Sequence, residues 1–544
     1  MPERPQHVGI LAIEVYFPTH FVTQTALEQQ TGAARGKFTE GLGQIEMAFC
    51  TDREDATSMG LTAFKQLLES YSVPFSQIGR LEVGSESGED RGKSIKSTLM
   101  SLFAGSGNTD VEGVDCLNAC YGSTAALQNA VAWVESSNWD GRLAVVVASD
   151  IAIYPPGPAR PTGGAGAVAM LIGPNAPLAL EPGMCATHME HTYDFYKPHG
   201  VFPVVNGRSS IACYLGALEK CYARLCRKAA SLGRQAGQSN TGLSLSSLAT
   251  KAASLAGLAS PETQQDPSQQ QPAKPSGTAA AEGSSRSATG SSVNLVAEPE
   301  SAEVVGLSSM DEAPICGSPG FGLGDVDYIV MHAPYHKIVR KGFARLLPID
   351  RLSQEMGAQA MSEAQILNRE ASVVHGARRE VSSKPSNASK EMERGLLLAS
   401  SDAFEAKVQP SMLLSQHCGN MYAASLYASL ASLLEARGSE LEGKRVMLFA
   451  YGSGLASSAF TLVGRPTSSA FTLQRLAGQV DLRARLAARL EANPADFDAA
   501  LQRLTDRFGA HSFMPEAPLA DLLPGTFYLH SIDEQYKRKY CRKA

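Results

Sequence analysis

The chain has 544 residues, of which 44% are hydrophobic and 19% are charged, and its net charge is −6. This composition predicts a globular protein with a large core. It argues against a polyanion binder, which would need a concentrated basic face, so we expect no nucleic-acid partner. No run of about 18 apolar residues occurs, so no membrane span is expected, and ten cysteines are too dilute for a disulfide scaffold.

The first predicted element is a buried strand at residues 8–14, a short apolar run. It is too short for the apolar core of a signal peptide and lacks the flanking residues, and no Arg-rich transit peptide precedes it. Because free thiols are expected as well, we predict a cytoplasmic protein.

Further strands of the first half frame two candidate site residues. These strands lie at residues 80–86, 143–150 and 165–173. The first of them ends on Glu86, and a turn of small residues then places Cys120 before a helix. Strands that alternate with helices in this way predict an α/β fold.

The composition changes at about residues 229–319, where Ser, Ala, Gly, Gln and Pro dominate and aromatic residues are almost absent. Such a segment buries too little apolar area to offset the entropy lost on ordering. We therefore predict a disordered insertion at residues 231–322, whose removal would leave folding and catalysis nearly intact. A weaker insertion of similar composition is predicted at about residues 352–394.

The second half repeats the order of the first. Its strands lie at residues 328–332, 445–453 and 457–464. The first of these ends on His332, and a turn of small residues places Asn420 before a helix, as Cys120 stands in the first half. Two similar halves would bring these residues and Glu86 to equivalent strand and helix ends, where open α/β sheets build their sites. The predicted domains are the halves 1–230 and 323–544 and the insertion between them.

Cys120 is the candidate nucleophile. A cysteine at a strand-to-helix turn sits where backbone N–H groups and the helix dipole favour an anion. Its pKa is therefore predicted to fall and to supply a thiolate for acyl transfer. The same N–H groups could form an oxyanion hole. The alternative is a small buried core residue, the usual place of a free cysteine.

Three further side chains complete the candidate set. Glu86 in a dry cleft could act as acid and base, and His332 at a strand end could polarise a thioester or ketone carbonyl. Asn420 could orient a carbonyl group or hold a water molecule. The alternatives are a solvated carboxylate, a hydrogen-bonded core histidine and a helix N-cap, respectively.

Three residue pairs have metal-ligand spacing, but they lie far apart in sequence and form no compact knuckle, so no metal site is predicted. The pairs are Cys116 and Cys120, His188 and His191, and His332 and His336. Lys337, Arg340 and Lys341 could hold the phosphates of a nucleotide-bearing carrier, or they could form a solvated helix face.

Short motifs along the whole chain carry a family resemblance. They lie at residues 43–44, 49–55, 80–86, 118–122, 159–164, 193–198, 332–335, 419–422, 451–455 and 525–529. In this order they resemble the eukaryotic type of the hydroxymethylglutaryl-CoA synthase family. The resemblance covers the chain except its insertions.

The resemblance implies a thiolase-like fold of two βαβαβαββ halves in five layers, α-β-α-β-α, and a homodimer. It implies an acyltransferase that condenses acetyl-CoA with acetoacetyl-CoA and water to (S)-3-hydroxy-3-methylglutaryl-CoA and CoA. The reaction belongs to the mevalonate pathway of isoprenoid and sterol biosynthesis, and no cofactor is expected. By motif, Cys120 matches the acylated nucleophile, Glu86 the general acid/base and His332 the residue that positions acetoacetyl-CoA.

The resemblance also implies a set of substrate- and CoA-binding positions. These are Ala34, Arg35, Thr162, Ser210, Lys337, Lys341, Asn420 and Ser453. Two positions depart from the family pattern. Pro158 stands where the family typically has Asn, which removes one contact to CoA, and His336 replaces a smaller residue. The long insertion is not a family feature.

Two alternatives stand beside this hypothesis. An initiating ketoacyl synthase of the same fold would use Cys, His and Asn without the glutamate at position 86. A non-catalytic scaffold would keep the fold and use the long insertion to bind partners.

Overall fold

The computed structural model describes residues 4–241, 321–355 and 387–544. Most of the two predicted insertions, 231–322 and 352–394, therefore lies outside the described residues. The chain divides into two compact units, Met1–Gln235 with Cys316–Ala544 and Ala236–Ile315, and the description below concerns the first. Among the described helices, none is long and apolar enough to cross a membrane.

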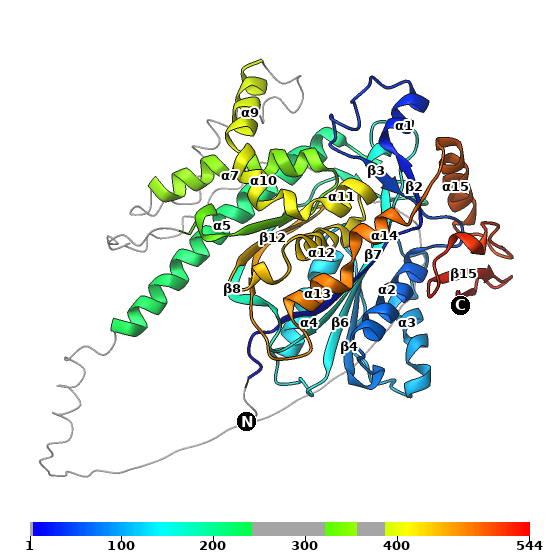
Figure 1. The fold of residues 1–544 in the computed structure, drawn as a ribbon, viewed down its shortest axis with the longest axis horizontal. Helices are drawn as coiled ribbons and strands as arrows, with labels where there is room; N and C mark the ends of the chain where they lie inside the picture. The colour runs from blue at the N-terminus through cyan, green and yellow to red at the C-terminus, as the bar shows by residue number, and fades with distance from the viewer. Residues whose placement is uncertain (1–3, 242–320, 356–386) are drawn as a thin grey trace, which may run out of the picture. The chain divides into compact units, whose positions relative to one another are not determined.

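The core of this unit is a nine-stranded sheet in the order β11-β12-β13-β8-β1-β7-β6-β4-β5 (Figure 1). The strands are β1 (Gly9–Tyr16), β4 (Ile78–Gly84), β5 (Asp115–Cys116), β6 (Leu143–Ala152), β7 (Gly164–Gly173), β8 (Leu178–Met189), β11 (Tyr328–Met331), β12 (Arg445–Gly452) and β13 (Ala456–Gly464). All residues of β1 and β7 are buried, as expected of apolar strands that are covered on both faces.

The sheet consists of two halves with the same pairing pattern. In the first, β4 runs parallel to β6, and β7 pairs antiparallel with β6 and β1. In the second, β11 runs parallel to β12, and β13 pairs antiparallel with β12 and β8. The halves join where Gly9 and Ile10 of β1 pair with β8. This arrangement confirms the α/β fold with two similar halves.

The second half begins earlier in the chain than the sequence suggested. β8 is the counterpart of β1, so the second half of the sheet starts at Leu178. The division predicted at residue 230 separates β8 from β13, the strand with which it pairs. Pro182 and Gly183 lie inside β8, and several of its residues are exposed, so its likeness to the buried β1 is weak in sequence.

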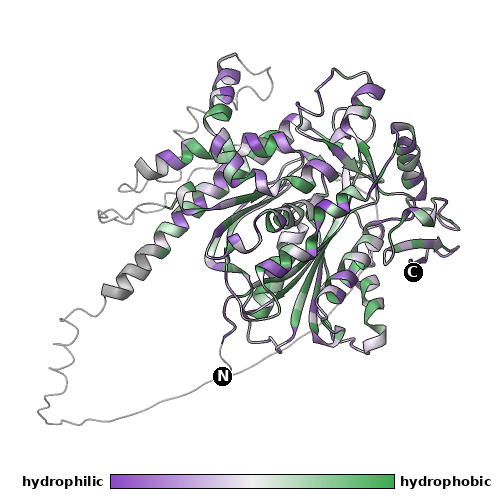
Figure 2. Cartoon of the chain, viewed as in Figure 1, coloured by the Kyte–Doolittle hydropathy of each residue, from purple (hydrophilic) through white to green (hydrophobic). Residues whose placement is uncertain are grey.

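Helices cover the two half-sheets and fill the space between them, in the predicted order of five layers. α2 (Ala56–Ser70) packs on β1, β6 and β7, and α5 (Gly207–Thr241) packs on the second half, where the Tyr214 ring lies 5.5 Å from that of Phe449. α4 (Gly122–Val134) and α12 (Ser425–Arg437) lie between the halves, where Thr124 Oγ1 and Tyr427 Oη are 2.9 Å apart. Figure 2 shows hydrophobic residues along the strands and the helices packed on them.

Local sequence explains where the covering helices begin and end. The Asp55 side chain accepts a hydrogen bond from Ser58 N, and the Ser58 hydroxyl accepts one from Asp55 N, a capping box that starts α2. The ten residues 425–434 of α12 are all buried, because this helix has a neighbour on every side. α5 continues to Thr241, past the predicted start of the long insertion at residue 231.

Smaller elements complete the unit. They are β2 (His20–Thr23), α1 (Gln24–Thr31), β3 (Glu46–Ala48), α3 (Ile95–Leu99), β9 (Phe195–Tyr196), β10 (Val204–Val205), α7 (His336–Glu355), α9 (Asn387–Ala399), α10 (Ser401–Lys407), α11 (Leu413–Cys418), α13 (Leu473–Val480), α14 (Leu482–Ala487), β14 (Leu490–Glu491), α15 (Pro494–Arg507), β15 (Phe527–Ile532) and β16 (Arg538–Arg542). α9 begins inside the weaker predicted insertion, so residues 387–394 are helical. The C-terminal hairpin is fixed to the first half, where Tyr540 donates a hydrogen bond to Asp55 Oδ2 at 2.8 Å.

Candidate active site

The end of β4 and the start of α4 bring Glu86 and Cys120 together. A Cβ atom on Gly84 would lie 2.2 Å from Ser123 N, so only glycine lets the start of α4 approach the end of β4 this closely. As a result, Cys120 Sγ donates a hydrogen bond to Glu86 Oε1 at 3.4 Å. Residues that are 34 positions apart in sequence thus form a thiol–carboxylate pair.

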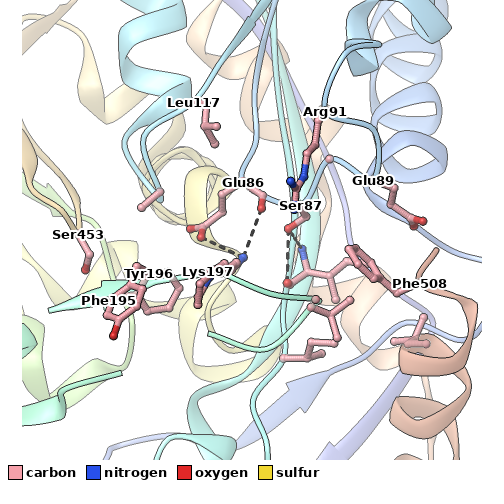
Figure 3. A pocket seen from close by; sticks show the side chains of 18 of the residues that line it. Glu86, Ser87, Glu89, Arg91, Leu117, Phe195, Tyr196, Lys197, Ser453 and Phe508 are labelled. Carbon is pink, nitrogen blue, oxygen red and sulfur yellow. Dashed lines mark hydrogen bonds and ion pairs between the residues drawn. The ribbon is translucent and has the colours of Figure 1, made fainter. Parts of the chain in front are cut away.

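A cavity of about 420 Å³ opens beside Glu86 (Figure 3), and Cys120 is not among the described residues that line it. Its lining includes Glu86, Ala119, Lys197, Ser453 and Arg507. Ser453 comes from the loop after β12, so the cavity takes residues from both halves, and the Ser453 carbonyl accepts a hydrogen bond from Asn118 at 3.4 Å. The sequence analysis predicted two of these lining residues, Glu86 and Ser453.

A second carboxylate lies behind the pair. Asp150 at the end of β6 is fully buried, and its Oδ1 accepts hydrogen bonds from Ser85 Oγ at 3.0 Å and from Glu86 N at 2.8 Å. Its Oδ2 accepts a bond from Ala423 N at 2.9 Å, which ties the site to the second half. Burial and then the neighbouring Glu86 carboxylate raise the pKa of Asp150. The sequence analysis treated Asp150 only as the end of a strand.

The predicted fall in the pKa of Cys120 is wrong. Burial raises the pKa of this thiol well above its usual range, and the negative charges of Glu86 and Asp150 raise it further, whereas Lys197 acts against them. The reason is the position of the side chain: α4 starts at Gly122, and Sγ faces carboxylates. A protonated thiol needs a base to become a nucleophile, and Glu86 is in contact with it.

Lys197 is a site residue that the sequence analysis did not single out. Its Nζ lies 3.0 Å from Glu86 Oε2 and 3.4 Å from the Glu86 carbonyl oxygen. The same ammonium group lies 4.5 Å from the centre of the Tyr422 ring, a cation–π contact with the second half. Its only signal in the sequence was its place in the 193–198 motif, because nothing local in that segment predicts a partner.

His332 follows β11 and is 2% exposed. Its backbone N donates a hydrogen bond to the Phe449 carbonyl at 2.8 Å, but its Nδ1 has no hydrogen-bond partner among the described residues. Burial lowers the pKa of His332 to about 3, so the imidazole is neutral near neutral pH. A neutral ring with an unpaired nitrogen is suited to receive a polar group of a bound molecule.

Asn420 has the capping role that was the alternative in the sequence analysis. Its Oδ1 accepts hydrogen bonds from Tyr422 N and from Ser425 Oγ, both at 2.9 Å. Its backbone N donates to the carbonyl oxygens of Thr162 and Gly163. The side-chain oxygen is therefore already engaged in the turn that starts α12.

Six predicted CoA-binding residues lie away from the cavity beside Glu86, and none of them is among the described residues that line it. They are Ala34 and Arg35 after α1, Thr162 before β7, Ser210 in the first turn of α5, and Lys337 and Lys341 on α7. Ala34 and Arg35 are exposed. Lys341 Nζ forms an ion pair of 2.7 Å with Glu393 of α9, so one of the predicted phosphate-binding cations already has a partner.

The two departures from the family pattern have different environments. His336 Nε2 lies 2.9 Å from Gln409 Oε1, and its backbone N donates to Gln44 Oε1 at 3.0 Å. A Cβ atom on Gly43 would lie 2.6 Å from the His336 ring, so glycine at 43 and histidine at 336 fit each other. Pro158 is exposed in the loop after β6.

The three residue pairs with metal-ligand spacing are not part of a larger ligand cluster in the described parts of the chain. No group of three or more His, Cys, Asp and Glu side chains there could hold a metal ion. His188 instead contacts Lys220 and Glu190, and His332 has the environment given above.

Comparisons with known proteins agree with this geometry. The family model described as hydroxymethylglutaryl-coenzyme A synthase N terminal matches residues 4–177, and the corresponding C-terminal model matches residues 178–250 and 310–543. The boundary between the two models falls at the start of β8. Residues 251–309, which neither model matches, lie inside the predicted long insertion.

Similar proteins share this description along nearly the whole chain. The human mitochondrial hydroxymethylglutaryl-CoA synthase is 39% identical over 99% of this chain and 90% of its own length. The human cytoplasmic hydroxymethylglutaryl-CoA synthase is 37% identical over 99% of this chain and 88% of its own length. Among solved structures, MvaS in complex with 3-hydroxy-3-methylglutaryl coenzyme A has a TM-score of 0.68 and 27% identity, with complete coverage of both chains.

Proposed function

The chain belongs to the hydroxymethylglutaryl-CoA synthase family, and we propose that it condenses acetyl-CoA with acetoacetyl-CoA and water at Cys120. The products are (S)-3-hydroxy-3-methylglutaryl-CoA and CoA. The observation that supports this site most directly is the contact of Cys120 Sγ with Glu86 Oε1 at 3.4 Å beside a cavity of about 420 Å³. One side chain can carry an acyl group, and the other can move protons at the carbon next to the acyl carbonyl.

The first step is acylation of Cys120. Glu86 Oε1 already accepts the hydrogen bond of the thiol, so it can take this proton as Sγ attacks the carbonyl carbon of acetyl-CoA. The tetrahedral intermediate then expels CoA, whose sulfur takes the proton from Glu86, and the acetyl group remains on Cys120 as a thioester. Because burial raises the pKa of Cys120, attack is coupled to this proton transfer.

The second step forms the carbon–carbon bond. Glu86 removes a proton from the methyl group of the acetyl thioester, and the enolate carbon attacks the ketone carbon of acetoacetyl-CoA. The new alkoxide takes the proton back from Glu86. Water then adds to the Cys120 thioester, which releases the product as a carboxylate and restores the thiol. The covalent intermediate predicts ping-pong kinetics.

We assign His332, Asn420 and Ser453 to the acetoacetyl-CoA side of the site. His332 is neutral and its Nδ1 is unpartnered, so its ring can donate one hydrogen bond to the ketone oxygen that becomes the alkoxide. Ser453 lines the cavity from the second half. Asn420 holds the turn that carries Tyr422, whose ring contacts Lys197, so its contribution to the site is indirect.

The CoA carrier is proposed to bind over α7, with the remaining predicted contacts from Ala34, Arg35, Thr162 and Ser210. Lys337 and Lys341 would contact phosphate groups. Because Lys341 is paired with Glu393, a phosphate must displace this carboxylate. E393Q should therefore lower KM for acetyl-CoA severalfold at unchanged kcat, whereas K341A should raise it. A KM that is unchanged in both variants would contradict the assignment.

We propose a homodimer that extends the sheet at β5. This two-residue strand ends the nine-stranded sheet, and its neighbours Val114 and Leu117 are 58% and 75% exposed. Leu117 also lines the cavity beside Glu86, so a second copy of the chain paired at β5 would adjoin the site. L117D should lower the mass measured by light scattering from that of a dimer to that of a monomer. An unchanged mass would contradict this interface.

We also propose that the protein acts in the mevalonate pathway, in the cytoplasm, without a metal or other cofactor, because the thioesters supply the driving force. The nine cysteines described in the structure are all free, as expected in a reducing compartment. Relatives include both cytoplasmic and mitochondrial enzymes, so fluorescence microscopy of the tagged full chain tests the location directly.

A thiol-release assay with both substrates tests the proposed function. The purified chain should release CoA from acetyl-CoA only slowly alone and rapidly with acetoacetyl-CoA, and mass spectrometry should identify 3-hydroxy-3-methylglutaryl-CoA. A ketoacyl product, or no acetyl-enzyme at all, would contradict the proposal and favour an initiating ketoacyl synthase or a scaffold, respectively.

A further inference from the structure

We propose that Lys197 is a positioning residue that fixes one carboxylate oxygen of Glu86 and thereby directs the other at Cys120. This inference rests on the proposed function, because it concerns the base of the same reaction.

The geometry divides the two oxygens of Glu86 between two partners. Oε2 lies 3.0 Å from Lys197 Nζ, and Oε1 accepts the hydrogen bond of Cys120 Sγ at 3.4 Å. Figure 3 shows Lys197 reaching Glu86 across the cavity. Lys197 also reaches the Glu86 carbonyl, so it contacts this residue at two points. A carboxylate with one oxygen fixed by an ammonium group presents the other in a defined direction.

The charges around Glu86 explain why it needs a cation. Its side chain is 4% exposed, and Asp150, a second buried carboxylate, accepts a hydrogen bond from its backbone N. Two carboxylates so close together repel each other, and a cation at Glu86 Oε2 offsets this repulsion while it holds the side chain in place. Among the described residues, Cys120, Asp150, Tyr154, Lys197 and Tyr422 interact with Glu86. The charged residues Glu89, Arg91 and Arg507 line the same cavity. Lys197 is the cation paired with Glu86 Oε2.

The position of Lys197 is fixed by contacts within the second half of the molecule. It follows β9, whose residues Phe195 and Tyr196 pair with Val205 and Val204 of β10. Three residues earlier, Asp194 accepts hydrogen bonds from Tyr451 Oη at 2.9 Å and from Gly454 N at 3.0 Å, which anchors this segment to the end of β12.

The Tyr422 ring supports the ammonium group itself. Lys197 Nζ lies 4.5 Å from the centre of this ring, and Tyr422 belongs to the turn that Asn420 caps. The cation–π contact favours a charged over a neutral amine at this point. The second half of the molecule thereby supports the base of the first half.

The test compares three lysine variants of the full chain over a range of pH. K197M removes the charge and keeps much of the side-chain volume, and K197R keeps the charge. K220M is the matched control, since Lys220 also forms an ion pair of 3.1 Å, with Glu190, outside the cavity. The measurements are the pH profile of condensation and the rate at which iodoacetamide alkylates Cys120.

K197M should move the acid limb of the condensation profile to higher pH by about one to two units, since an adjacent cation no longer favours the charged carboxylate. Alkylation of Cys120 should also move to higher pH, because Lys197 opposes the carboxylates that raise the pKa of this thiol. K197R should restore most of both shifts, and K220M should leave both at the wild-type values.

Three results would overturn the inference. One is an acid limb that stays at the wild-type pH in K197M. Another is an equal loss of activity in K197M and K197R without a shift of either limb, which would indicate a purely structural role. The third is a shift of the same size in K220M. Failure of the proposed function would be recognised separately, because the wild-type chain would then form no 3-hydroxy-3-methylglutaryl-CoA, whereas the alkylation profile is measured without turnover.

Discussion

Two turns at equivalent places in the halves, residues 118–120 and 418–420, share a positive φ at the middle residue and differ in what the next residue does. The middle residue has a positive φ in both, 41° at Ala119 and 78° at Gly419. Glycine is required in the second turn, because a Cβ atom at 419 would lie 1.9 Å from the Gly163 carbonyl oxygen. Ala119 lines the cavity instead and accepts an uncommon conformation beside the candidate nucleophile.

The residues that follow Ala119 and Gly419 differ in their surroundings. Cys120 faces the carboxylate of Glu86, which belongs to another element. Asn420 directs its Oδ1 back to Tyr422 and Ser425 of its own turn. The duplicated fold therefore supplies two equivalent positions, and the side chains brought against each decide whether the residue reacts or caps. The predictions below test this division of roles.

Loss of the nucleophile should have the largest effect. C120S should form no acetyl-enzyme, and its turnover should fall by about three orders of magnitude or more, since a hydroxyl beside Glu86 supplies no comparable anion near neutral pH. Mass spectrometry of the intact protein after incubation with acetyl-CoA measures the first effect. C418A is the control in the other turn and should be acetylated normally. Near-normal turnover by C120S would contradict the role of Cys120.

Loss of the acid/base should separate the two chemical steps. E86Q should be acetylated more slowly, because it lacks the base that takes the thiol proton. Removal of this negative charge also lowers the pKa of Cys120 and moves its alkylation by iodoacetamide to lower pH, so acetylation should be reduced less than condensation. Condensation should fall by roughly two to four orders of magnitude. Single-turnover measurements of both steps check this difference, and equal loss of the two would point to a structural role for Glu86.

Loss of His332, which follows β11 in the second half, should affect only the reaction with acetoacetyl-CoA. H332A should lower kcat/KM for acetoacetyl-CoA by about 10- to 100-fold and leave acetyl-enzyme formation unchanged. Burial lowers the pKa of His332 to about 3, below the working range, so the imidazole is neutral on both limbs of the pH profile. The limbs should therefore stay in place in H332A. A limb that disappears with His332 would show that the imidazole titrates during turnover.

The capping role of Asn420 should give the smallest effect, on stability. N420A leaves Tyr422 N and the Ser425 hydroxyl without their acceptor, so the free energy of unfolding should fall by about 1 kcal/mol. N420D keeps the acceptor oxygen and should retain the wild-type melting temperature. Thermal unfolding followed by circular dichroism measures both, and a wild-type midpoint in N420A would contradict the cap.

The amino-acid sequence by itself determined the α/β class and the two similar halves, and it singled out Glu86, Cys120, His332 and Asn420 as candidate site residues. These features depend on local patterns: apolar strands, small-residue turns before helices, and their order along the chain. Composition alone located the long insertion. No contact across the molecule was needed for any of them.

Only the tertiary structure decided which neighbours each residue has. The assignment of β8 to the second half depends on its pairing with β13, and the role of Lys197 depends on a contact over 111 positions. The pKa of Cys120 is shifted upwards, whereas the sequence predicted a downward shift, because the effects of burial and of two carboxylates outweigh that of the helix start. Desolvation and charge–charge interactions depend on distance in space, and a sequence pattern specifies distance only along the chain.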